Sequence, residues 1–115
     1  MKFGEIVDSV YIDLRKFTEY ALNPEHARGS HKARVFKSAL GYDRENLQEL
    51  KAQIEAKILL MEADEGMADK HGRRFVVDLP ITGPSGKQAV VRTCWLVPPG
   101  SKEARLTTLL VRKKS

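Results

Sequence analysis

The spacing of apolar residues changes once along this chain of 115 residues. In the first half they recur every three or four positions, as on one face of an α-helix, whereas beyond residue 72 they alternate, as in a β-strand. This change predicts an α+β domain. We expect about three N-terminal helices packed on one face of a C-terminal, three- to four-stranded antiparallel sheet.

The first half of the chain predicts a short strand and then three helices. Residues 9–12 alternate weakly, although a helix that starts earlier is the alternative. The helices are predicted at 14–22 after a capping Asp13, at 31–40 after Ser30, and from 44 to about 63 after Asp43. Gly41 stands where a left-handed residue ends a helix. The third helix has the most regular apolar stripe, formed by Leu47, Leu50, Ile54, Ile58 and Met61.

The second half predicts three strands, at 74–79, 88–97 and 105–112, separated by turns rich in glycine and proline. Residues 83–87 read GPSGK, which lacks the spacing and the following helix of a phosphate-binding loop, so they are interpreted as a hairpin turn. In the middle strand, period two places Arg92 and Cys94 on one face and Thr93 and Trp95 on the other. The pattern leaves open which face the helices cover, and which face of the third strand carries Thr107.

Length and composition predict a single domain over residues 1–115. With Cys94 as the one cysteine, no internal disulfide forms, which is typical of a cytoplasmic protein. No apolar run reaches the roughly 20 residues of a membrane span, and acidic residues near the N-terminus argue against a signal peptide. We therefore expect no membrane association.

Charge is distributed unevenly along the chain. Residues 1–40 carry a net charge of +2, residues 41–69 carry −5 and residues 70–115 carry +8, within an overall +5. A basic C-terminal third favours RNA or another polyanion as partner, together with a possible acidic inhibitor protein. Solubility alone is the competing explanation for the basic charge.

Residues 23–33, NPEHARGSHKA, concentrate cationic and imidazole groups in a loop that leads into a helix N-terminus. Cleavage of RNA through its own 2′-hydroxyl needs a base of near-neutral pKa and cations around the phosphate. His26 is the candidate base and Lys32 a candidate phosphate ligand. Arg28, Gly29 and His31 are expected to bind substrate. The alternative is an ordinary polar surface loop.

The middle strand contributes the second cluster. Arg92 lies within an apolar strand, where an arginine is costly to bury unless paired, so it is expected either to bind an anion or to pair with Asp78 of the neighbouring strand. Thr93 and Trp95 are candidate substrate contacts, with a core position as the alternative for Trp95. Cys94 is interpreted as a small buried hydrophobic residue.

The strings LNPEHARGSHKARVFKSALGY and VRTCWLVPPG resemble a small uncharacterised bacterial domain family. Its members occur alone or at the ends of phage-related and toxin-like proteins. The matching positions are His26, Gly29 and Lys32 in the first string and Arg92, Thr93 and Trp95 in the second. At the level of fold, the layout is also similar to barnase-like, colicin-type and RelE-type RNase toxins. This chain departs from a two-histidine mechanism, because its sheet contains no histidine.

Together these features predict a toxin-like, metal-independent endoribonuclease without a cofactor. His26 would act as general base, Lys32 and Arg92 would hold the phosphate, and Thr107 or Thr93 would donate a hydrogen bond to it. The alternatives are a non-catalytic basic module that binds nucleic acid or an acidic protein, and an adaptor protein of a phage or secretion system.

Overall fold

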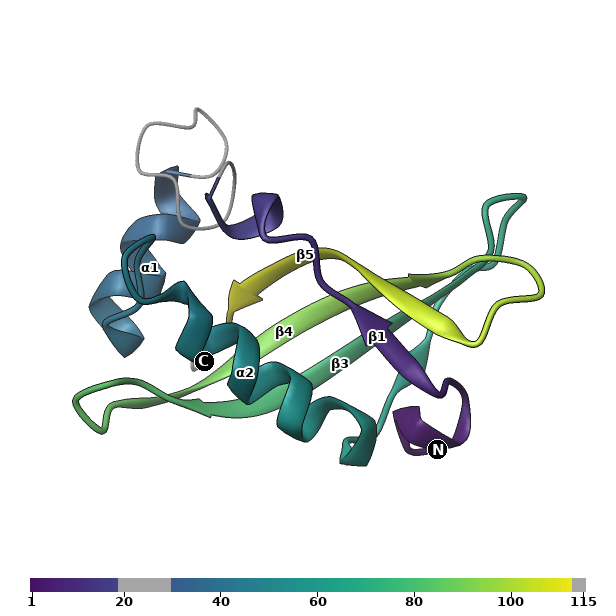
Figure 1. Ribbon diagram of the computed structural model, residues 1–115, viewed down its shortest axis with the longest axis horizontal. Coiled ribbons are helices and arrows are strands. Elements are labelled where there is room, and N and C mark those ends of the chain that lie inside the picture. Colours follow the sequence, from purple (N-terminus) through teal and green to yellow (C-terminus); the bar gives the residue numbers. More distant parts are fainter. Residues whose placement is uncertain (19–29, 113–115) are drawn as a thin grey trace.

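The structure is a computed structural model that describes residues 1–18 and 30–112. In this part of the chain five strands form one sheet in the order β1-β5-β4-β3-β2. The helices α1 (Ser30–Leu40) and α2 (Leu47–Lys57) lie on one side of it, with α2 crossing β3 and α1 at the end where β5 finishes (Figure 1). The strands are β1 (Ser9–Tyr11), β2 (Asp64–Glu65), β3 (Arg73–Thr82), β4 (Gln88–Val97) and β5 (Glu103–Val111).

The α+β class is confirmed, but the expected all-antiparallel sheet is wrong. Strands β3, β4 and β5 form the expected meander and β2 adds antiparallel to β3. Strand β1, however, pairs parallel with β5, Ser9 opposite Glu103 and Tyr11 opposite Arg105. A parallel pair needs a long crossover, and here most of the chain separates the two strands. The result is a mixed sheet of five strands.

Helix α1 ends where predicted but begins one residue earlier, at the Ser30 that was expected to cap it, and two glycines set its position. Its residues Ala33, Phe36 and Leu40 are buried. Gly41 has φ +84° and donates its N–H to the carbonyls of Phe36 and Lys37, which ends the helix. In the β3–β4 hairpin, a Cβ at Gly83 would lie 1.8 Å from the Leu40 carbonyl oxygen, so only glycine permits the hairpin to approach the helix end.

The third predicted helix, 44 to about 63, is too long at both ends. Asp43 does not cap it, because the Asp43 carboxylate accepts from the Glu45 N–H and the Asn46 side chain accepts from the Asp43 N–H, which forms a separate turn. At the other end α2 passes into a 3₁₀ turn, Ile58–Leu60. Met61 is then extended, and its carbonyl accepts from the Phe3 N–H. Tertiary pairing with the N-terminal segment thus overrides the helical period.

Side chains of α2 cover the part of the β3 edge that β2 does not pair with. Gln53 bonds both the N–H and the carbonyl of Thr82, and Lys57 donates to the carbonyl of Pro80. Pro80 itself has no N–H to offer a further strand. This edge is therefore closed to pairing with another chain.

Strand β5 contains a β-bulge that the sequence did not predict. Cys94 pairs with Thr108 and Trp95 with Leu106, so Thr107 is the extra residue. Because of it, Leu106 and Leu109 both reach the core, which simple alternation forbids.

The first predicted helix is described only at its start. Residues 15–18 are helical, and the Asp13 carboxylate accepts from the Arg15 N–H as an N-cap would. The rest, residues 19–22, lies outside the described part of the chain. In residues 1–18 and 30–112, no helix is long and apolar enough to cross a membrane.

Candidate nucleic-acid interface

The two faces of the sheet differ in what covers them. On the face beneath the helices, alternate residues of the long strands are buried, among them Phe75, Val77, Leu79, Val91, Thr93 and Trp95. The intervening residues point the other way and are half-buried or exposed. We call the second surface the open face. It carries Asp78, Arg92 and Cys94.

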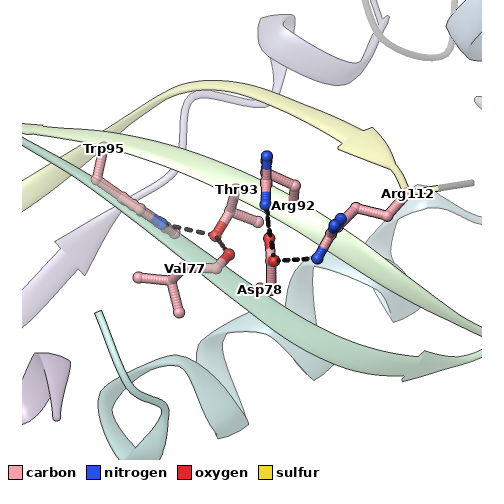
Figure 2. Close-up of polar contacts among 6 residues, drawn as sticks. All are labelled: Val77, Asp78, Arg92, Thr93, Trp95 and Arg112. Atoms are coloured by element: carbon pink, nitrogen blue, oxygen red, sulfur yellow. Dashed lines mark hydrogen bonds and ion pairs between the residues drawn. The ribbon is translucent and has the colours of Figure 1, made fainter. Parts of the chain in front are cut away.

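Thr93 and Trp95 belong to the covered face. The Trp95 indole N–H donates to the Thr93 hydroxyl at 2.8 Å, and that hydroxyl donates to the Val77 carbonyl at 2.7 Å (Figure 2). Trp95 is 1% exposed and Thr93 is fully buried. Their proposed role in substrate binding is therefore wrong for this structure, and the alternative, a core position, is confirmed for Trp95. The sequence could not decide this because either face of β4 was a candidate for burial.

Arg92 lies on the open face, paired with Asp78 directly across the strands. Its Nε and an Nη donate to the two carboxylate oxygens at 2.9 and 3.1 Å. Arg112 donates to the same carboxylate at 3.0 Å from the end of β5 (Figure 2). The two guanidinium side chains are 39% and 50% exposed. The hydrogen bonds and charge of Arg92, and then those of Arg112, hold the pKa of Asp78 below its usual value. In turn, the hydrogen bond and charge of Asp78 raise the pKa of Arg92.

The carboxylate of Asp78 balances one of the two guanidinium charges, and Asp64 on β2 adds a second, weaker negative influence on Arg92. The expected pairing of Arg92 with Asp78 is thus confirmed, but the pair is not under the helices. Each guanidinium has five N–H donors, and Asp78 takes two from Arg92 and one from Arg112. The remaining donors can bind a second anion from solvent.

Lys32 reaches the same face from α1. Its Nζ donates to the Thr108 hydroxyl at 3.1 Å, although the two residues are 76 positions apart. Thr108 lies opposite Cys94 in the sheet, so the ammonium group is next to the strand that carries Arg92. The structure therefore brings together Lys32 and Arg92, two of the expected phosphate ligands.

The bulge decides which threonine hydroxyl of β5 keeps a hydrogen that can be donated on the open face. The Thr107 hydroxyl donates to the Cys94 carbonyl at 3.0 Å, so its one hydrogen is already used. The Thr108 hydroxyl instead accepts from Lys32, and its own hydrogen can point to an anion. Sequence reasoning named Thr107 and missed Thr108, since no local signal revealed the bulge.

Cys94 lies between the two cations and is half-buried rather than fully buried. Burial raises the pKa of its thiol, and Asp78 adds to the increase, whereas the charges of Arg92 and Lys32 lower it. The thiol therefore stays protonated near neutral pH. Both cations lie near this thiol, because Arg92 is two residues away on β4 and Lys32 donates to Thr108, which is opposite Cys94.

The remaining expected site residues are only partly placed. His31 is exposed in the first turn of α1, next to Lys32. His26, Arg28 and Gly29 lie outside the described residues, so their roles stay predictions. Sequence reasoning also missed Arg112. This residue follows the last strand directly, and nothing in the local sequence indicates that it pairs with Asp78 on β3.

Comparison with known proteins gives one family and one structural neighbour. Residues 2–113 match a family described as a domain of unknown function (DUF6883). No curated protein matches the chain. A chain from a contact-dependent growth inhibition toxin–immunity protein complex of Klebsiella pneumoniae 342 has a similar fold, with a TM-score of 0.64 and 19% identity. The alignment covers 88% of this chain and 98% of that one.

Proposed function

This chain belongs to the DUF6883 family, and from that premise we propose that it is a toxin-like, metal-independent endoribonuclease that binds RNA on the open face. The observation that carries the proposal is that Arg92 and Arg112 share the carboxylate of Asp78 on the open face, while Lys32 donates to Thr108 on the same face. Of the two arginine charges, Asp78 balances one. The name of the structural neighbour, a complex of a growth-inhibition toxin and an immunity protein, supports the toxin-like part and a protein partner.

The proposed reaction is a transesterification at phosphorus. The ribose 2′-oxygen attacks the adjacent phosphorus, and His26 accepts the proton that leaves this oxygen. The bond from phosphorus to the 5′-oxygen breaks, and that oxygen is protonated by an acid or by water. The products are a 2′,3′-cyclic phosphate and a 5′-hydroxyl. Lys32, Thr108 and the free donors of Arg92 would bind the phosphoryl oxygens as their charge grows.

The test is cleavage of purified total RNA in EDTA. We expect cleavage by the wild type, and about 100-fold slower cleavage by His26→Ala and by Arg92→Gln, in line with the loss of a general base or of one charge-stabilising donor. Arg44→Gln is the matched control, because Arg44 is exposed between the two helices and its loss removes the same charge. Absence of cleavage by the wild type, or equal rates for wild type and His26→Ala, would contradict the proposal.

A second candidate function is supported by the Asp78 contacts themselves. Because Asp78 already holds both arginines, the open face can serve as a fixed basic surface that binds RNA without cutting it. This alternative predicts binding that weakens as salt rises, with a slope that falls when Arg92 or Lys32 is replaced, and no RNA products.

A further inference from the structure

Tyr11 differs from the other aromatic residues in the described part of the chain. Of the seven that the structure describes, six are at most 1% exposed, while Tyr11 is 52% exposed. It is the last residue of β1, whose middle residue Val10 packs against the core. Strand alternation therefore turns Tyr11 to the open face.

Arg105 is the partner of Tyr11 on β5. It is exposed, whereas the preceding residue, Ala104, is fully buried on the covered face. Tyr11 and Arg105 therefore project side by side from the same face. In residues 1–18 and 30–112 the guanidinium of Arg105 has no ion pair or hydrogen bond. The nearest acidic residue on β5 is Glu103, two residues before Arg105. It lies in the opposite direction from Thr108, the residue that binds Lys32.

This pair is continuous with the cations already described. Arg105 also lies opposite Leu96, which is four residues from Arg92 on β4 and on the same face. Four residues of a strand span about 13 Å. That distance exceeds the roughly 3.4 Å rise of one nucleotide in a stacked strand, so the two positions would contact different nucleotides.

We infer that Tyr11 and Arg105 form a second contact site for single-stranded RNA, in which a base stacks on the Tyr11 ring and Arg105 binds a neighbouring phosphate. An exposed aromatic ring beside a cation is what unpaired bases bind, because every base has a face that stacks and every nucleotide carries a charge. This inference deepens the proposed function and rests on its assignment of RNA to the open face.

The test is binding of a fluorescent single-stranded RNA and of polyphosphate, a polyanion without bases, measured by anisotropy and by competition over a range of salt. Tyr11→Leu is expected to weaken RNA binding about 10-fold, to leave polyphosphate binding unchanged and to leave the salt slope unchanged. Tyr11→Phe, which keeps the ring, should bind like the wild type. Arg105→Gln should weaken both ligands and reduce the salt slope for RNA by about 0.7.

The outcomes separate this inference from the proposed function. Equal RNA binding by wild type and Tyr11→Leu, or an equal loss for RNA and polyphosphate, would overturn the stacking site, even if Arg92→Gln still slowed cleavage as expected. Tyr11-dependent binding without RNA products would keep the site and contradict the nuclease. The protein could instead bind an acidic protein more tightly than an RNA of the same charge, with an affinity that Tyr11→Leu does not change. That result would assign the open face to a protein partner and overturn the inference. Circular dichroism and urea denaturation of Tyr11→Leu check that the variant keeps the fold and its stability.

Discussion

Thr93 and Arg92 are neighbours in β4, but they lie on opposite faces of the sheet and their polar groups meet opposite conditions. Thr93 is enclosed, and its hydroxyl both accepts from Trp95 and donates to Val77. Arg92 is partly exposed and shares its carboxylate with a second arginine. The covered face thus uses its polar groups completely, because a buried group without a partner is costly, whereas the open face can keep unused donors in contact with water.

This difference indicates where binding can occur. Among the described residues, no buried side-chain nitrogen or oxygen lacks a hydrogen-bond partner, so the covered face offers no free polar group to a ligand. On the open face, water competes for the same donors and is exchanged when an anion arrives. Two adjacent residues of β4 therefore differ in what they can do: Thr93 stabilises the fold, and Arg92 has donors that a ligand can reach.

The largest effect is expected from Thr93→Val, which keeps the shape of the side chain but removes its hydroxyl. Trp95 would lose its buried acceptor, and the free energy of unfolding should fall by about 1–3 kcal/mol. Urea denaturation measures this loss. Thr108→Val is the matched control on the open face, where water can replace the hydroxyl, and it should cost less than about 0.5 kcal/mol. Similar losses for the two variants would contradict the contrast between the faces.

A smaller, pH-dependent effect is expected from Asp78→Asn. The pKa of Asp78 is lowered below its usual 3.8, so its stabilising contribution is present above the unfolded-state pKa and is lost as pH falls through the folded-state value. Because both arginines are more than a third exposed, the contribution should stay below about 1 kcal/mol.

The measurement for Asp78→Asn is the free energy of unfolding from neutral pH down to below pH 3.8. The wild type should lose its advantage over the variant across the acid end of this range. Asp8→Asn, which removes an exposed carboxylate near β1, controls for the loss of one surface charge. A stability difference between wild type and Asp78→Asn that stays constant with pH would show that the carboxylate charge is not what joins the two arginines.

Local patterns predicted much of this fold. The bounds of β4 are as expected, α1 begins one residue earlier than expected, and alternation separated Arg92 from Thr93 correctly. The pairing of Arg92 with Asp78 was one of two open alternatives, since neighbouring strands with opposite charges suggest it. These features depend on residues close in sequence or on a hairpin with a short turn, so local physics suffices for them.

Features that depend on distant pairing could not be predicted. The three residues of β1 carry no information about a parallel partner some 94 positions away. Without that pairing, the sequence could not predict that Tyr11 lies exposed beside Arg105. The bulge at Thr107 reverses the faces of the residues after it, so alternation in β5 failed. The hypothesis for His26 stays a prediction, because residues 19–29 lie outside the described part of the chain.

The smallest expected effect is on the reactivity of Cys94, which makes the one thiol a reporter for the open face. Burial raises the pKa of this thiol, so iodoacetamide should modify it more slowly than a free cysteine near neutral pH, and denaturant should remove the difference. Arg92→Gln removes a charge that lowers the pKa and should slow the reaction further by a factor of a few, whereas Asp78→Asn should accelerate it. If RNA occupies the open face, saturating single-stranded RNA should protect the thiol. Faster modification of Arg92→Gln would contradict the placement of the guanidinium beside the thiol, and unchanged modification of the wild type under saturating RNA would place the RNA elsewhere.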